Sequence, residues 1–204
     1  MERNTVLIWF KKDLRTVDNF CLSHSLGCDK ALPVYIHDET STPKIGQSSR
    51  VWLHHSLASL QQSLDNHLNL YKGNTLTVLE HLLSHHPIAH VVWNKDLCPD
   101  SQQLEEKVFD LCQKNNVSAH AFNSNYLYGP NDVLKDDGTF YKVFTAFKKK
   151  ALKNPPRDLL GPSHDYQYVH DEANTTSLTD LQLLPAHHWH ESMMQHWQVG
   201  EEAA

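Results

Sequence analysis

The feature that most restricts the fold of this chain is a regular alternation between short apolar runs and longer segments of helical periodicity. Five runs have the length and apolar content of buried strands: residues 5–10, 31–37, 68–72, 88–94 and 117–122. Strands that alternate with helices pair in parallel through right-handed crossovers, which place helices on both faces of the sheet. The sequence therefore predicts an α/β fold with a doubly wound, parallel, five-stranded sheet (Rossmann-like), a three-layer sandwich.

The segments between the apolar runs have the three- and four-residue spacing of amphipathic helices. In the segment 51–68 we expect one buried face, formed by Trp52, Leu53, Leu57, Leu60, Leu64 and Leu68. In the segment 75–86 the buried face is expected to hold Leu76, Leu79, Leu82 and Leu83. A third helix is expected to have Asp100 or Ser101 as its N-cap and to bury Leu104, Val108, Leu111 and Cys112.

A change of pattern near Asn154 predicts a boundary. The stretch NPPRDLLGPSHDYQYVHDEANTTS is rich in proline and turn-forming residues and has no sustained period. We therefore expect an α/β domain at residues 3–153 and an irregular region at residues 154–204. The final letters, WQVGEEAA, resemble the start of another helix, so we expect the protein to continue beyond them.

Composition and charge argue against several classes of protein. No window reaches the roughly 20 apolar residues of a membrane span, and the N-terminus enters the first strand without a signal peptide. The four cysteines form no C-x-x-C pair, which favours reduced thiols and a cytoplasmic location. A net charge of −6 opposes nucleic-acid binding. The one basic stretch, YKVFTAFKKKALKNPPR, is more simply interpreted as a solvated helix face.

Charged side chains follow several of the expected strands. Open parallel sheets bind ligands beyond the carboxyl ends of their strands, where the strand order reverses. The residues expected at this edge are Lys11, Lys12, Asp13, His37, Asp38, Lys95, Asp96 and Asp100, together with Arg50 at the start of a helix. They suit a ring system with polar edges or an anionic tail. Alternatively, these charges pair with one another and cap helices.

Other groups of reactive residues do not predict a metal, catalytic or nucleotide-binding site. The sixteen histidines include adjacent pairs, but neighbours on a helix point about 100° apart and cannot share one metal ion. The sequence contains no G-x-S-x-G elbow, no P-loop and no G-x-G-x-x-G dinucleotide motif. We therefore expect neither a metal site nor a catalytic residue in this chain.

Several stretches, in order along the chain, carry a resemblance to a known family. LIWFKKDLRTVDN, ALPVYIHDE, SSRVWLHHSLASL, VVWNKDLCP and YKVFT resemble the N-terminal half of DNA photolyases and cryptochromes. The resemblance implies an α/β domain that carries a light-harvesting antenna chromophore. It also implies a following helical domain, whose FAD transfers an electron to a pyrimidine dimer in DNA. Residues 154–204 would then be the linker and the start of that helical domain.

The resemblance also implies an antenna pocket. In deazaflavin-binding members, an aspartate in the position of Asp96 hydrogen-bonds the chromophore ring, and Lys12, Tyr35, Asp38 and Arg50 match other pocket positions. Folate-binding members use an asparagine–glutamate pair where this chain has Asp100 and Ser101. A deazaflavin or flavin antenna is therefore expected rather than folate, and FAD is expected only in the helical domain.

The functional expectation is the antenna domain of a deoxyribodipyrimidine photolyase, part of light-driven dimer repair. Its expected partners are the helical FAD-binding domain of the same protein and, through that domain, damaged DNA, with no membrane. On its own the chain should be inactive. The alternatives are a blue-light receptor of the cryptochrome type, or a free-standing nucleotide-binding or regulatory module, because the fold alone does not separate them.

Overall fold

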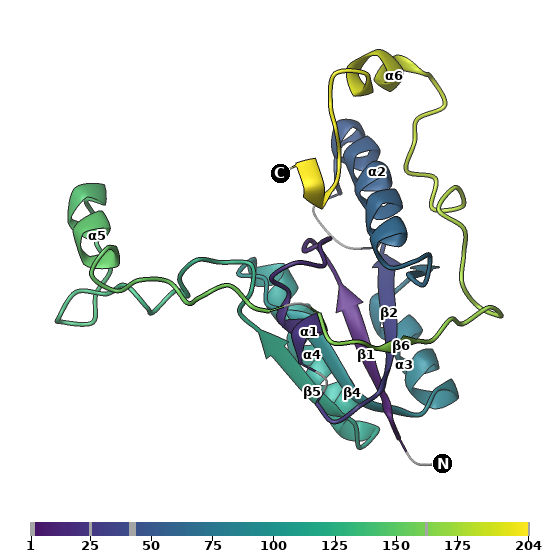
Figure 1. Ribbon diagram of the computed structural model, residues 1–204, viewed down its shortest axis with the longest axis horizontal. Coiled ribbons are helices and arrows are strands. Elements are labelled where there is room, and N and C mark those ends of the chain that lie inside the picture. The colour runs from purple at the N-terminus through teal and green to yellow at the C-terminus, as the bar shows by residue number, and fades with distance from the viewer. Residues whose placement is uncertain (1–2, 25, 41–43, 162, 204) are drawn as a thin grey trace.

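The computed structural model describes residues 3–24, 26–40, 44–161 and 163–203. Its centre is a parallel sheet of β1 (Thr5–Phe10), β2 (Lys30–His37), β3 (Asn69–Lys72), β4 (Ile88–Asn94) and β5 (Ser118–Phe122). The strand order is β3-β2-β1-β4-β5, so the chain winds outward from β1 in both directions (Figure 1). This confirms the expected doubly wound, five-stranded parallel sheet.

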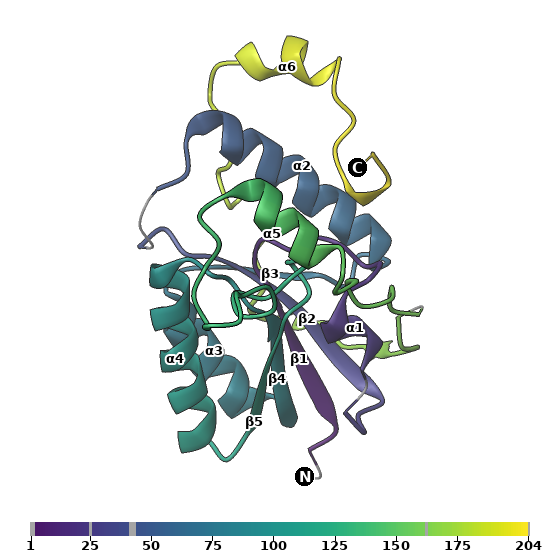
Figure 2. The ribbon, with the colours of Figure 1, turned by 90° about the vertical axis from the view of Figure 1, so that its left-hand side faces the viewer.

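Helices cover the sheet from both sides. On one face lie α1 (Phe20–Ser23) and α2 (Gln47–Ser63), and on the other lie α3 (Thr75–His85) and α4 (Pro99–Lys114). Figure 2 shows α3 and α4 to the left of the strands and α1 to the right. The remaining helices are α5 (Phe144–Ala151), α6 (Trp189–Met194) and the 3-10 turn η1 (Glu201–Ala203). In the described part of the chain, no helix is long and apolar enough to span a membrane.

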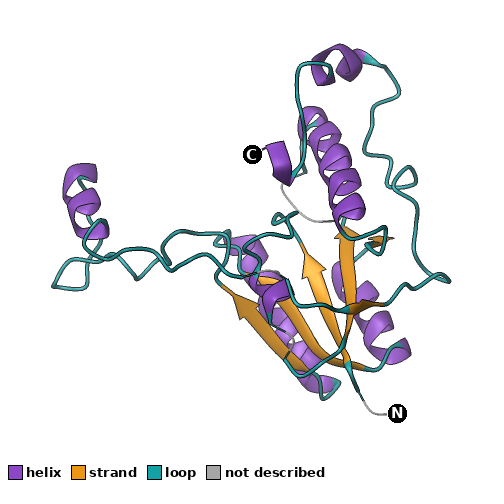
Figure 3. Cartoon of the chain, viewed as in Figure 1, coloured by secondary structure: helices purple, strands orange, loops and turns teal. Residues whose placement is uncertain are grey.

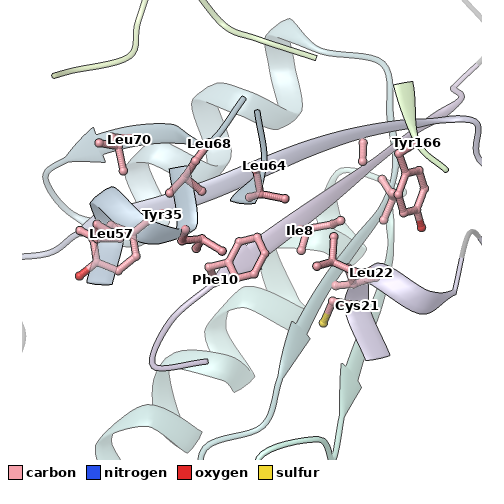
Figure 4. Close-up of a cluster of buried hydrophobic side chains, with 14 of the residues drawn as sticks. Ile8, Phe10, Cys21, Leu22, Tyr35, Leu57, Leu64, Leu68, Leu70 and Tyr166 are labelled. Atoms are coloured by element: carbon pink, nitrogen blue, oxygen red, sulfur yellow. The ribbon is translucent and has the colours of Figure 1, made fainter. Parts of the chain in front are cut away.

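The core is divided between the two faces of β1. Because successive side chains on a strand point to opposite faces, Ile8 and Phe10 pack toward α2, whereas Leu7 and Trp9 pack toward α3 and α4. Figure 4 shows the first cluster, in which Ile8 and Phe10 lie together with leucines from α1, α2, β3 and the segment between α2 and β3. All six residues of β1 are buried, as expected for a central strand covered on both faces.

Two expectations about the helices are wrong. Trp52 is 43% exposed rather than part of the buried face of α2, because it lies on the side of the helix that faces a cavity. The N-cap of α4 is Cys98, followed by Pro99, rather than Asp100 or Ser101. Proline suits the first helical position because its fixed φ is helical and its missing N–H is not needed there. The Ser101 hydroxyl donates to Asp96 instead.

The region after residue 154 is less irregular than expected. Gln167–Tyr168 form a sixth strand, β6, which pairs in parallel with Lys30 and Ala31 of β2. Two paired residues leave no periodicity that a sequence could reveal. The division of the chain at residue 153 stays a prediction.

The basic stretch lies on an arm that extends away from the sheet and carries α5 (Figure 3). Lys148, Lys149 and Lys150 occupy the last turn of α5, where cations interact favourably with the helix dipole, and all three are exposed. Lys150 also pairs with Asp136 at 3.1 Å. These positions agree with a solvated helix face.

Candidate functional site

A cavity of about 950 Å³ opens at the carboxyl ends of β1 and β2, beside α2. Its apolar wall includes Trp9, Phe10, Ile36, Trp52, Leu53 and Leu104. Its polar rim includes Lys12, His37, Asp38, Arg50 and Glu201. A cavity of this size with apolar walls and a few polar groups is typical of a site for a small organic molecule.

The strand order reverses between β1 and β4, and on that side the cavity is lined by Lys11, Lys12 and Asp13 after β1 and by Ser101 and Leu104 of α4. At the end of β4, Asn94 donates to Asp13 at 2.5 Å and to Asn19 at 2.9 Å. Asn19 also accepts from the Cys21 N–H at 3.1 Å and so caps α1. This hydrogen-bonded network joins the ends of β1 and β4 beneath part of the cavity edge, and a ligand at this edge of the sheet stays a prediction.

Three of the expected rim charges, Lys11, Lys12 and Asp96, take part in ion pairs. Lys11 forms an ion pair with Glu105 of α4, and Lys12 pairs with Asp96 at 2.5 Å. Asp96 and two other expected rim residues, Lys95 and Asp100, are not among the described residues that line the cavity. Ion pairs of this kind are what the alternative interpretation expects, but Lys11 and Lys12 also line the cavity, so both interpretations stay predictions.

Of the five residues singled out as antenna contacts, Lys12, Tyr35, Asp38 and Arg50 line the cavity. Asp96 is not among the described lining residues. It pairs with Lys12, and it accepts from the Cys98 N–H at 3.1 Å and from the Ser101 hydroxyl at 2.9 Å. Contact of these residues with a chromophore stays a prediction.

Asp38 is a firmly held part of the rim. One of its oxygens accepts from the backbone N–H and hydroxyl of Thr40, and the other accepts from those of Thr75 at 2.8 and 2.9 Å. Burial alone would raise the pKa of Asp38, but these hydrogen bonds outweigh it and lower the pKa below its usual value. The carboxylate therefore stays charged and joins the end of β2 to the start of α3.

Tyr35 and Arg50 supply polar groups from two elements. Tyr35 is 7% exposed, and burial raises its pKa to about 12, so the phenol keeps its proton at neutral pH. Arg50 donates through Nη2 to the carbonyl of Gln182, while its buried Nε has no hydrogen-bond partner in the described part of the chain. Together with the aromatic wall, this arrangement can hold a planar ring and hydrogen-bond its edge.

Some lining residues were missed by reasoning from the sequence. The sequence predicts Trp9 and Phe10 only as part of a buried strand, and Trp52 only as part of the buried face of a helix, yet all three line the cavity. Gly200 and Glu201 lie in the region expected to be irregular, yet both line the cavity. Local periodicity carries no signal for a contact made by so distant a segment.

The hydrogen bonds to Asp96 should make the free energy of unfolding fall at acidic pH. Burial would raise its pKa, but hydrogen bonds from Lys12, Cys98 and Ser101 lower it to about 2 from 3.8. A lowered pKa contributes stability above the unfolded value, and that contribution is lost as the pH falls from about 4 to about 2. Because the Lys12 side chain is 72% exposed, solvent screens its attraction to Asp96, and the expected loss of stability is about 1 kcal/mol.

Urea unfolding at pH 5 and pH 2.5 checks this expectation. The stability advantage of the wild type over Asp96→Asn should shrink by about 1 kcal/mol at the lower pH. Asp110→Asn, an exposed substitution on α4, is the control and should show no such change. Equal pH dependence of the wild type and Asp96→Asn would contradict the role given to Asp96.

Comparisons with known proteins identify relatives of this chain. The family model described as DNA photolyase matches residues 6–163. The deoxyribodipyrimidine photo-lyase of Agrobacterium fabrum is 28% identical over 212 residues, which cover 98% of this chain and 43% of the relative. Cryptochrome-2 of Arabidopsis thaliana is 29% identical over 158 residues, which cover 74% of this chain and 26% of the relative.

Solved structures show the same fold. The bacterial class III photolyase from Agrobacterium tumefaciens matches with a TM-score of 0.88 and 27% identity, over 100% of this chain and 43% of that one. An archaeal photolyase from Sulfolobus tokodaii matches with a TM-score of 0.72 and 21% identity, over 87% of this chain and 41% of that one, and supports the fold alone. The chain thus spans less than half the length of these relatives. It belongs to the DNA photolyase family, to whose N-terminal α/β domain it corresponds.

Proposed function

We propose that this chain is the antenna domain of a photolyase, with the chromophore bound in the cavity beside α2. The observation that carries the proposal is the cavity itself: about 950 Å³ at the carboxyl edge of β1 and β2, with aromatic walls and a charged rim. Lys12, Tyr35, Asp38 and Arg50 would contact the chromophore. Asp96 would act through Lys12, whose ammonium group it pairs with at 2.5 Å.

The proposed chromophore is a deazaflavin or flavin rather than folate. Ser101 stands where folate-binding members have an acidic side chain, and its hydroxyl is already donated to Asp96 at 2.9 Å. The rim therefore lacks the acidic anchor that the resemblance would require for a folate at this position. The Sulfolobus tokodaii structure is described as holding two FAD molecules, with the implication of a novel light-harvesting cofactor.

The activity of the complete protein is part of the same proposal. We infer a light-driven lyase that repairs pyrimidine dimers, in which residues 154–204 link this domain to a helical domain that holds FAD and meets the DNA. The net charge of −6 gives this chain little attraction for damaged DNA, and the catalytic FAD would lie in the helical domain, so alone the chain should bind neither catalytic FAD nor damaged DNA and should repair nothing. A cytoplasmic location is inferred from the cysteine pattern.

Two other functions remain as competitors. A cryptochrome would use the same domain without repair, and Cryptochrome-2 of Arabidopsis thaliana is among the relatives. A free-standing nucleotide-binding or regulatory module would show no helical FAD domain in the gene beyond Ala204.

The proposal is tested by titrating the protein with a 5-deazaflavin, FMN and a reduced folate, following absorption and fluorescence. We expect the deazaflavin or FMN to bind at least tenfold more tightly than folate. Asp96→Asn should weaken binding about tenfold, because loss of a charged hydrogen-bond partner costs about 1.5 kcal/mol. Asp110→Asn, exposed on α4, is the matched control.

A preference for folate, or unchanged binding in Asp96→Asn, would contradict the proposed antenna. The same preparation is assayed for light-dependent repair of a dimer-containing oligonucleotide at physiological salt. Repair above background would show that this half of the protein carries the catalytic activity, whether or not a flavin is bound as antenna.

A further inference from the structure

The last described segment of the chain returns to the cavity from a distant position. After α6, the chain runs back beside α2 and ends above the loop that follows β1 (Figure 1). Trp197 contacts Trp52 of α2 edge to face, with ring centroids 6.0 Å apart. Gly200 and Glu201 then form part of the cavity wall. A segment more than 180 positions away from β1 therefore helps to enclose the candidate site.

The carboxylate of Glu201 is bound by the loop after β1. One oxygen accepts from the Thr16 N–H at 2.7 Å and from its hydroxyl at 3.0 Å, and the other accepts from the Val17 N–H at 2.6 Å. In the described part of the chain, the Thr16 and Val17 N–H groups have no other acceptor. Hydrogen bonds to an ionised acceptor are the stronger kind, so this contact holds both ends of the carboxylate in place.

The loop held in this way carries much of the cavity rim. Lys11, Lys12, Asp13, Leu14 and Arg15 all line the cavity and directly precede Thr16. On the other side of the loop, Arg15 donates to the carbonyl and hydroxyl oxygens of Ser124 at 2.8 and 2.9 Å. Glu201 and Arg15 thus secure adjacent positions in the middle of this loop, which ends where α1 begins at Phe20.

The position of Glu201 depends on a close approach of the backbone to α2. Gly200 has a φ of +121°, and a Cβ at this residue would lie 2.2 Å from Oγ and 2.9 Å from Cβ of Ser59. Any side chain here would push the segment away from α2 and move the neighbouring carboxylate. Glycine at position 200 is therefore needed for the contact made by Glu201.

We propose that Glu201 is a positioning residue for the chromophore cavity: it holds the loop after β1 in the shape that the bound chromophore requires. The inference rests on the proposed function, because the cavity is taken as the antenna site. It goes beyond that function by making chromophore affinity depend on the segment 197–201, which lies outside the α/β domain predicted at residues 3–153.

The test compares Glu201→Ala and Glu201→Gln with Glu202→Gln, an exposed neighbouring substitution. Glu201→Ala should weaken binding of the 5-deazaflavin or FMN about tenfold or more, and Glu201→Gln should have an intermediate effect because its amide keeps one acceptor. Gly200→Ala should weaken binding like Glu201→Ala. Glu202→Gln should bind like the wild type, and the absorption band of the bound chromophore should shift only in the first three variants.

Amide hydrogen exchange without chromophore provides a second, independent measurement. In Glu201→Ala the Thr16 and Val17 amides should exchange at least tenfold faster, while amides of β1 keep their wild-type rates. Wild-type affinity together with wild-type exchange in Glu201→Ala would overturn the inference and leave the proposed function standing. If the wild type binds no chromophore, the proposed function fails instead, and amide exchange alone then decides whether Glu201 holds the loop.

Discussion

Replacement of Trp93 by alanine is expected to lower the free energy of unfolding by about 3–5 kcal/mol. Trp93 on β4 is completely buried, and its ring lies 5.9 Å from that of Trp9 and 4.7 Å from that of Phe109 on α4. Truncation removes the largest fully buried side chain and leaves a cavity between the sheet and α4. Because small domains have a total stability of about 5–15 kcal/mol, the loss is a large fraction of the whole.

Trp93→Phe is the matched control and should stay within about 1.5 kcal/mol of the wild type. The indole Nε1 of Trp93 is buried and has no hydrogen-bond partner in the described part of the chain. Phenylalanine removes this unsatisfied donor and keeps most of the aromatic contact, so the two effects oppose each other. Urea unfolding followed by far-UV circular dichroism measures both variants. Equal losses in Trp93→Ala and Trp93→Phe would contradict a packing role.

Asn69→Ala is expected to lower the free energy of unfolding by about 2–4 kcal/mol and to release the segment that contains β6. The Asn69 side chain is completely buried, and its amide donates to the carbonyls of Pro33, His67 and Val169 at 3.0–3.1 Å. Its oxygen accepts from the Asp171 N–H at 2.8 Å. Alanine leaves these buried backbone groups without their partner, and a methyl group offers none.

Chymotrypsin digestion reports on the release, because Tyr166 and Tyr168 lie in the segment that Asn69 holds. Tyr166 is 6% exposed in the folded protein, so cleavage beside it requires the segment to leave the sheet. Asn69→Ala should be cut there faster than the wild type, and Asn131→Ala, an exposed substitution, should not. Unchanged cleavage in Asn69→Ala would mean that β6 is held by other contacts.

A large part of the fold can be predicted from the sequence, because a buried strand or helix face requires apolar residues at regular spacing in the local sequence. The apolar runs that became β1 and β4 are buried on both faces, and the leucine spacing of α3 follows the turn of a helix facing the sheet. Part of the candidate site follows for the same reason. Parallel strands end at one edge, so residues after β1 and β2, such as Lys12 and Asp38, lie together on the cavity rim.

Which of these edge residues meet open space was decided only by the tertiary structure. The sequence gives no sign that Asn94 reaches Asp13 and Asn19, or that a cavity opens beside α2. Nor does it show that Glu201 binds the loop at Thr16, or that β6 joins β2. A residue's own periodicity indicates whether it is buried and on which face. It does not identify a partner 75 or 185 positions away, because that contact depends on how the intervening elements pack.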